Sequence, residues 1–122
     1  MADYDDLTPR FLSGCANGLP LLVTASTAGG ANTIDTATSS TDDADFWHVW
    51  ATNTHTAALK FVVLVGGTTE PDNVVYSETV EAGMRVIVLD GYMVNNSKTL
   101  KAYGATGSKF TVDGMKWTRT GA

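Results

Sequence analysis

The chain has 122 residues, of which 43% are hydrophobic and 17% charged, and its net charge is −5. This length predicts a single domain that buries roughly two-thirds of its unfolded surface. The net acidity argues against nucleic-acid binding, which needs clustered basic side chains. No apolar run approaches about 18 residues, so we expect no membrane span. The acidic start, Met1 to Asp6, is unlike an export signal.

The numbers of cysteine and threonine residues exclude some kinds of site and favour one fold class. Cys15 is the only cysteine, which excludes an internal disulfide framework and a cysteine-based metal site. Threonine occurs eighteen times, while leucine, lysine, glutamate and arginine are sparse. Branched Cβ atoms favour extended backbone, so the composition predicts an all-β protein.

Residues 1–18 mix acidic and widely spaced apolar residues around Pro9, and we expect them to form an extended N-terminal arm. Residues 19–122 are expected to form one domain. Within it, β-branched and aromatic segments alternate with Gly, Pro, Asn and Asp, which predicts strands separated by turns. The predicted strands are 19–25, 32–38, 46–53, 58–65, 73–79, 84–89, 98–102 and 109–118.

Two of these segments carry the clearest patterns. Alternation in 46–53 places Trp47 and Trp50 on opposite faces, so we expect one in the core and the other facing outward or toward a neighbouring subunit. Segment 58–65, whose only polar residue is Lys60, predicts a central strand covered on both faces. Asp90-Gly91 predicts a turn, and Gly114 indicates a bulge in the last strand.

About eight short strands without a helix predict a single antiparallel β-sandwich of jelly-roll type, with a closed barrel as the alternative. The inward-facing positions of the most apolar strands give the expected core. Those residues are Phe61, Val63, Val65, Val86, Val88, Phe110 and Val112.

The sequence offers no set of catalytic, metal-binding or cofactor-binding residues. His48 lies between two tryptophans and His55 lies in a turn, and no nucleophile motif accompanies either. The acidic run 42–45 lacks the glycine and distant glutamate of a calcium loop, so we interpret it as a solvated turn or a salt-bridge partner for a neighbour. The run 66–69 lacks the lysine and helix of a phosphate loop. We therefore expect a protein that is not an enzyme and needs no cofactor.

Three features carry a likeness to known proteins: Trp50-Ala51-Thr52-Asn53, the apolar strand after it, and Gly66-Gly67-Thr68-Thr69-Glu70-Pro71-Asp72 before the next strand. Together with Gly114 they cover about residues 20–118. In these features the chain resembles small head-accessory proteins of tailed bacteriophages and gene transfer agents. Such proteins decorate or cement the capsid, or form the base of head spikes.

The resemblance implies a virion structural protein that is made in the cytoplasm of a bacterial host and lies on the capsid exterior. Its implied partners are the major capsid protein and further copies of itself, as a symmetric homo-oligomer and in particular a trimer. We expect no nucleic-acid or membrane partner. The alternatives are a spike-base or tail-associated protein, and a carbohydrate-binding host-adhesion module that would use Trp47, Trp50 and Trp117.

The N-terminal arm is the predicted contact with the particle. This segment is too polar to belong to the core and too apolar to be a tail without contacts. We therefore expect its apolar side chains to order against a neighbouring subunit or the shell. A frayed terminus is the alternative. The expected interface residues are Tyr4, Leu7, Arg10, Phe11 and Leu12.

Overall fold

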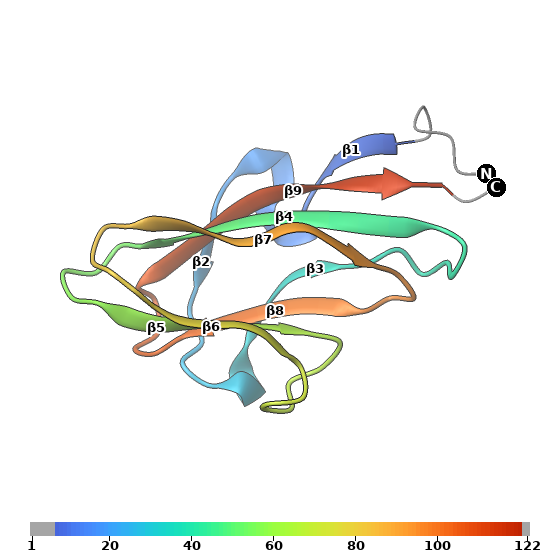
Figure 1. Cartoon of the computed structure of the whole chain (residues 1–122). Helices are drawn as coiled ribbons and strands as arrows, with labels where there is room; N and C mark the ends of the chain where they lie inside the picture. The colour runs from blue at the N-terminus through green and yellow to red at the C-terminus, as the bar shows by residue number, and fades with distance from the viewer. Residues whose placement is uncertain (1–6, 121–122) are drawn as a thin grey trace.

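A computed structural model describes residues 7–120 of the chain, which contain nine strands and two short 3₁₀ turns (Figure 1). Neither turn is long and apolar enough to cross a membrane, and these are the helical segments of the described residues. The elements are β1 (Leu7–Phe11), η2 (Ser13–Gly18), β2 (Leu21–Val23), η3 (Ala28–Gly30), β3 (Asn32–Thr36), β4 (Ala44–Asn53), β5 (Leu59–Val65), β6 (Val74–Val80), β7 (Arg85–Val94), β8 (Thr99–Gly104) and β9 (Phe110–Arg119).

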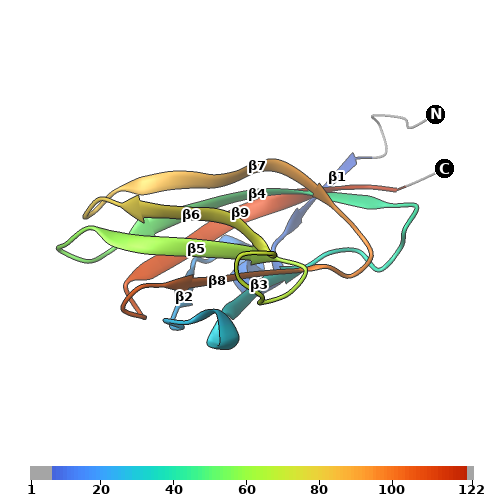
Figure 2. The same cartoon turned by 60° about the horizontal axis from the view of Figure 1, so that its bottom comes forward.

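The strands form two antiparallel sheets packed face to face, as Figures 1 and 2 show from two directions. Sheet A has the order β1-β9-β4-β7, with β2 also paired to β9. Sheet B has the order β3-β8-β5-β6. The predicted all-β, jelly-roll-like sandwich is confirmed. The eight predicted strands are present, and β1 is a ninth that the sequence analysis did not predict.

The core lies between the sheets and is centred on aromatic side chains. Phe61 of β5 and Phe110 of β9 are buried, and their ring centroids are 4.7 Å apart. Of the predicted core, Phe61, Val63, Val88, Phe110 and Val112 are buried, while Val65 and Val86 pack at its margin.

The two patterned strands also behave as predicted. Trp47 is fully buried, whereas Trp50 is half-buried on the opposite face of β4. β5 lies between β8 and β6, and both Val62 and Leu64 are buried on its side away from the core. A central strand covered on both faces is therefore confirmed.

The N-terminal segment differs from the expected extended arm that binds a neighbouring subunit or the shell, because its described part belongs to the sandwich of its own chain. β1 pairs with β9 along its whole length. Leu12 and Cys15, in and beside η2, are fully buried in the core of their own chain. Burial raises the pKa of the Cys15 thiol, although a backbone hydrogen bond at Leu21 opposes this. The apolar residues of the segment cover the margin of β9, which would otherwise be a free edge.

Two local predictions were wrong. Asp90-Gly91 does not end a strand, since β7 continues through it to Val94. Gly91, with a φ of 82°, is instead an extra residue between Asp90 and Tyr92 in the pairing with β4. Gly114 is not a bulge, because the β4–β9 register continues past it without a shift. A Cβ at this position would collide with the carbonyl oxygen of His48, so glycine allows close approach of the two backbones.

We expect Gly114→Ala to destabilise the fold by about 1–3 kcal/mol, because the added methyl group overpacks the β4–β9 contact at a strained φ. Urea unfolding followed by circular dichroism measures the loss. Gly29→Ala is the matched control, since a Cβ there has no heavy atom within 4 Å. Equal unfolding midpoints for the two variants would contradict the steric explanation.

Candidate functional site

The surface of sheet A that faces away from sheet B carries a row of apolar side chains. The strand register places Met93 of β7 opposite Phe46 of β4, Phe46 opposite Trp117 of β9, and Trp117 opposite Pro9 of β1. Every second residue of a strand points to the same side. The row therefore crosses four strands on one side of the sheet, which we call the outer face of sheet A.

Further apolar side chains extend this row along the strands. Phe11 and Met115 are paired next to it, and Ile87 is paired with Trp50 beyond His48. Phe11 is 59% exposed, Ile87 58%, Met93 64% and Trp117 37%. With roughly 150–250 Å² for a large side chain, these fractions leave an apolar area on the order of 400 Å², a size that often marks an interaction site.

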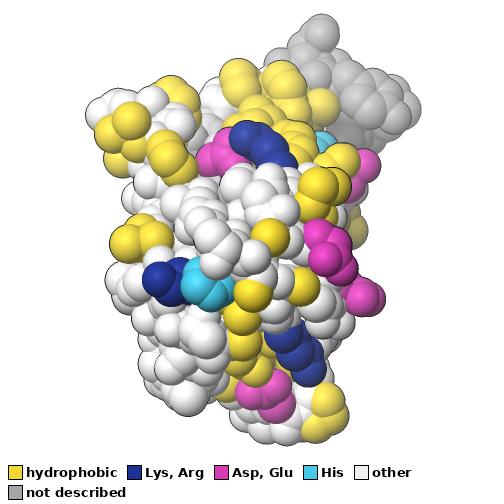
Figure 3. All heavy atoms as spheres, turned by 90° about the vertical axis from the view of Figure 1, so that its left-hand side faces the viewer, with side chains coloured by type: hydrophobic (Ala, Val, Ile, Leu, Met, Phe, Trp, Pro, Cys, Tyr) yellow, Lys and Arg dark blue, Asp and Glu magenta, His cyan; other side chains and the backbone are white. Residues whose placement is uncertain are grey.

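Two pairs of charged or titratable side chains flank the apolar row. Arg85 Nη2 lies 2.7 Å from Asp113 Oδ2, and its guanidinium carbon lies 5.5 Å from the ring centre of Trp50. His48 Nδ1 lies 3.3 Å from Asp90 Oδ1. Figure 3 shows hydrophobic side chains gathered at the upper side of the molecule, where sheet A lies, beside basic and acidic side chains. The outer face of sheet A thus has an apolar centre with polar margins.

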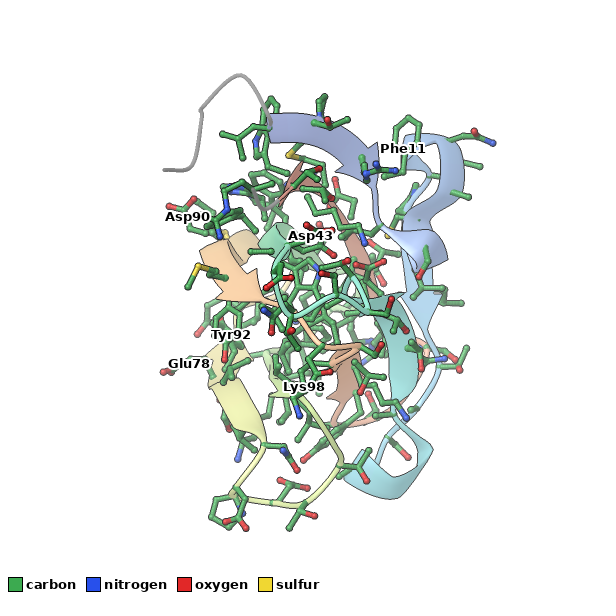
Figure 4. All side chains as sticks on the ribbon, turned by 90° about the vertical axis from the view of Figure 1, so that its right-hand side faces the viewer. Phe11, Asp43, Glu78, Asp90, Tyr92 and Lys98 are labelled. Atoms are coloured by element: carbon green, nitrogen blue, oxygen red, sulfur yellow. The ribbon has the colours of Figure 1, made fainter. Side chains whose placement is uncertain are left out.

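The outer face runs from one margin of the molecule to the other. Figure 4 shows Phe11 at the margin formed by β1, and Asp90 with Tyr92 at the opposite margin formed by β7. Tyr92 lies on the other side of β7, where it is 36% exposed and stacks on Trp47 with ring centroids 6.2 Å apart. The face therefore ends at β7, the outer strand of sheet A.

The free edges of both sheets are irregular. Every register shift in the described pairings places its extra residue in an outer strand, since β3, β6 and β7 each lie at the end of a sheet. The extra residues are Ile34, Val75, Val88 and Gly91. The remaining edge consists of β1, which contains Pro9, and β2, which has three residues. Bulges, proline and short strands all hinder the addition of a further strand.

A second feature, the buried charge cluster, joins the two sheets. Lys116 Nζ of β9 donates to Asp35 Oδ2 of β3 at 2.8 Å and to Asp45 Oδ2 of β4 at 3.1 Å. Both aspartates are 1% exposed, and the side chain of Lys116 is 12% exposed. Burying a lysine and two carboxylates costs desolvation free energy, so the fold can accommodate them only if these groups are fully hydrogen-bonded.

Both oxygens of each carboxylate in this cluster accept further hydrogen bonds. Asp35 accepts from the backbone N–H of Ser13 at 2.9 Å and from Trp47 Nε1 at 2.8 Å. Asp45 accepts from the backbone N–H of Thr38 at 2.9 Å and from Thr118 Oγ1 at 2.7 Å. The bulge at Ile34 explains why Asp35 points inward, because both residues of this adjacent pair are buried.

The cluster borders a shallow hollow of about 280 Å³ at the surface. Its lining residues are Arg10, Thr36, Thr38, Asp43, Asp45, Lys116, Thr118 and Thr120. Within residues 7–120, no group of three or more His, Cys, Asp and Glu side chains is placed to hold a metal ion. The acidic run 42–45 is thus not one solvated turn, since Asp45 is buried and paired with a lysine of its own chain.

The predicted interface residues are not brought together by the fold. Leu7 and Phe11 alternate with Pro9 along β1 and belong to the outer face of sheet A. Arg10 points to the other side of β1 and lines the hollow beside Asp45. Leu12 is fully buried in its own core, so it is not available to a neighbouring subunit. Tyr4 lies outside the described residues.

Sequence reasoning missed Met93 and Ile87 of the outer face and the whole buried charge cluster. The alternation of β4 already placed Phe46, His48 and Trp50 on one side, but their neighbours depend on pairing between distant strands. His48 faces outward next to Asp90, and His55 is half-buried in the β4–β5 turn, with its backbone N–H bonded to Asn53 Oδ1.

No known protein family and no curated protein matches the chain. A chain in the structure of infectious bursal disease virus, Gx strain, is 8% identical with a TM-score of 0.51, and the match covers 99% of this chain and 34% of that one. A Clostridium thermocellum endo-1,4-β-D-xylanase 10B with CBM22-1 and GH10 modules is 17% identical, with a TM-score of 0.44 and coverage of 98% and 27%. A Podospora anserina GH26-CBM35 β-(1,4)-mannanase is 12% identical, with a TM-score of 0.45 and coverage of 97% and 28%.

This chain therefore spans about a third or less of the length of each of these chains. At such low identities the likeness concerns the fold alone. The antiparallel β-sandwich described above is shared with a chain from a virus structure.

Proposed function

We propose that this chain is a structural protein of a tailed phage or phage-like particle, which decorates the exterior of the capsid and cements it. The observation that carries this proposal is the outer face of sheet A, where an apolar row crosses four strands and remains exposed. An exposed apolar face of this kind is favourable only when a partner covers it. The partner proposed here is the major capsid protein.

The dimensions of the face suit this role. Four strands spaced about 4.8 Å apart, of which β4, β7 and β9 have ten residues and β1 has five, present an area of about 570 Å² at roughly 3.4 Å per residue. A specific interface buries about 800 Å² on each partner. The outer face of sheet A can therefore supply most of one such interface, with the margins supplying the remainder.

The sheet edges support attachment through a face. Strand addition needs a regular edge with a free row of backbone groups. The bulges in β3, β6 and β7, and Pro9 in β1, interrupt that row on every side of the sandwich. A protein that must remain separate before it binds a lattice gains from blocked edges, because they oppose aggregation.

Many identical copies would bind one shell, so a modest affinity per copy suffices if copies are also linked to one another. We also propose that the chain forms a symmetric homo-oligomer, in particular a trimer. Light scattering of the purified chain measures its mass in solution. We further propose that the chain is made in the cytoplasm of a bacterial host before it joins the particle.

We expect Met93→Glu to weaken binding to assembled particles by at least about tenfold, because it places an unpaired charge in the apolar row. Co-sedimentation of the purified variant with particles lacking the protein measures the loss. Met84→Glu is the matched control, since Met84 is 52% exposed in the turn before β7, away from the outer face. Equal binding of the two variants, both with native circular dichroism, would overturn the proposed attachment face.

A carbohydrate-binding module is the second candidate, and exposed Trp117 is the observation in its favour. Aromatic faces stack on sugar rings, but one face of Trp50 is already occupied by the guanidinium of Arg85. A glycan array with the wild-type chain and Trp117→Ala distinguishes the candidates. Binding to a glycan that the substitution abolishes would favour the adhesion module over the capsid protein.

A further inference from the structure

The buried charge cluster holds a primary amine, 12% exposed, against a carboxyl group that is 1% exposed. Lys116 Nζ lies 2.8 Å from Asp35 Oδ2. Because a carbon–oxygen bond is about 1.2 Å long, Nζ lies no more than about 4 Å from Asp35 Cγ. Well-oriented groups within one molecule reach effective concentrations of roughly 10⁵–10⁸ M, and this pair is already near the distance at which such reactions occur. The two groups belong to different sheets, so the fold alone brings them together.

From this geometry we infer that Lys116 and Asp35 condense within the folded chain to form an amide between Nζ and Cγ. The cluster is thus a site of covalent modification as well as an ion pair. The product is an isopeptide bond that links β3 of sheet B to β9 of sheet A.

The neighbours of the pair have the roles that this reaction requires. Asp45 Oδ2, 3.1 Å from Nζ, is placed to accept a proton from the attacking nitrogen. The backbone N–H of Ser13 and the indole N–H of Trp47 both donate to the Asp35 carboxyl group. The Ser13 N–H donates to Oδ1, the oxygen on which negative charge develops when Cγ becomes tetrahedral, while the indole of Trp47 donates to Oδ2, the oxygen that takes the lysine proton and leaves as water.

The reaction needs no oxidant or cofactor. Nζ first passes one proton to Asp35, which gives a neutral amine and a carboxylic acid. The nitrogen lone pair then attacks Cγ, and Asp45 takes a second proton from the nitrogen. Asp45 returns that proton to the departing hydroxyl group, which leaves as water. One C–N bond forms, one C–O bond breaks, and the Asp45 carboxylate is regenerated.

The surroundings favour the amide over the ion pair. Both aspartates are 1% exposed, and charged groups that are removed from water carry a large desolvation penalty. Condensation replaces an ammonium and a carboxylate by one neutral amide, and Asp45, which loses its cation, keeps its hydrogen bonds from the Thr38 N–H and Thr118 Oγ1. Asp35 does not line the surface hollow and is 1% exposed, so its carbonyl carbon is protected from attack by water, which slows hydrolysis of the product. The link closes a loop between positions 35 and 116, and it adds a covalent bond between two sheets that also share the hydrogen bond from Trp47 to Asp35.

Mass spectrometry of the intact, denatured full-length chain tests this inference. We expect a mass lower than that of the sequence by one water molecule, after allowing for removal of the initiator methionine. Trypsin should then leave residues 11–60 joined to residues 110–119, since it does not cleave after a modified Lys116. Both aspartates lie in the first peptide, so its fragment spectrum must place the link on Asp35. A wild-type chain of full mass, or a link to Asp45, would overturn the assignment.

Three variants separate the roles of the residues. Lys116→Arg keeps the positive charge but removes the reacting amine, and Asp45→Asn removes the proton acceptor, so both should have the full mass. Asp113→Asn, in the exposed pair with Arg85, is the matched control and should still lose water. Circular dichroism checks that each variant is folded. Loss of water in folded Lys116→Arg would refute the inference.

Discussion

Replacement of Lys116 by methionine should destabilise the protein by at least about 3 kcal/mol, the lower end of the cost of breaking a buried ion pair from one side. Methionine preserves most of the side-chain volume, so the loss of packing is small. The variant leaves Asp35 and Asp45, each 1% exposed, without the cation that both contact. If the wild-type chain carries the amide link, the loss is larger, because the variant also lacks the cross-link.

Chemical denaturation followed by tryptophan fluorescence measures this effect, since buried Trp47 donates directly to Asp35. Arg85→Met is the matched control, because it removes the cation of an ion pair whose side chains are 53% and 29% exposed. Exposed ion pairs contribute about 0–1 kcal/mol. Similar losses in both variants would show that the cluster contributes no more than a surface pair.

Phe61→Ala should destabilise the protein by about 3–5 kcal/mol, the usual result of emptying a large aromatic site in a core. Phe61 is fully buried in the central strand of sheet B. Its ring centroid is 4.7 Å from that of Phe110 and 6.5 Å from that of Tyr76, so its removal leaves a cavity between the two sheets. The midpoint of urea unfolding should fall accordingly.

Met84→Ala is the control for this substitution, since Met84 is 52% exposed in a turn and its loss should change stability by less than about 0.5 kcal/mol. The slope of the unfolding transition should stay the same in both variants, because neither changes the surface exposed on unfolding by much. A Phe61→Ala midpoint close to that of Met84→Ala would place the centre of the core elsewhere.

The outer face of sheet A shows which contacts a local sequence pattern can predict and which it cannot. Alternation along 46–53 separates Trp47 from Trp50 correctly, because the side-chain period of a strand is a local property. The same alternation cannot supply the partners of Phe46. Met93 and Trp117 lie next to it only because β4 pairs with both β7 and β9, and those strands are distant in the sequence.

The N-terminal segment shows that composition alone does not predict which surface a segment binds. Its composition fits an arm that binds a neighbouring subunit, and it fits equally a strand that binds its own sheet. The structure decides for the second in residues 7–12, because β9 offers an unpaired side to which β1 can add. Leu12 is consequently part of the core, while Phe11, its neighbour, is exposed on the outer face.

The sequence by itself determined the fold class, most strand positions, the central place of β5 and most of the core, because these depend on alternation, β-branched residues and turn signals. Only the tertiary structure decided which charges meet. Asp35, Asp45 and Lys116 look like ordinary surface residues in the sequence, and Lys116 is 81 positions from Asp35. A bulge at Ile34 and the pairing of β4 with β9 turn all three inward. Such contacts arise from long-range strand pairing, which no local pattern contains.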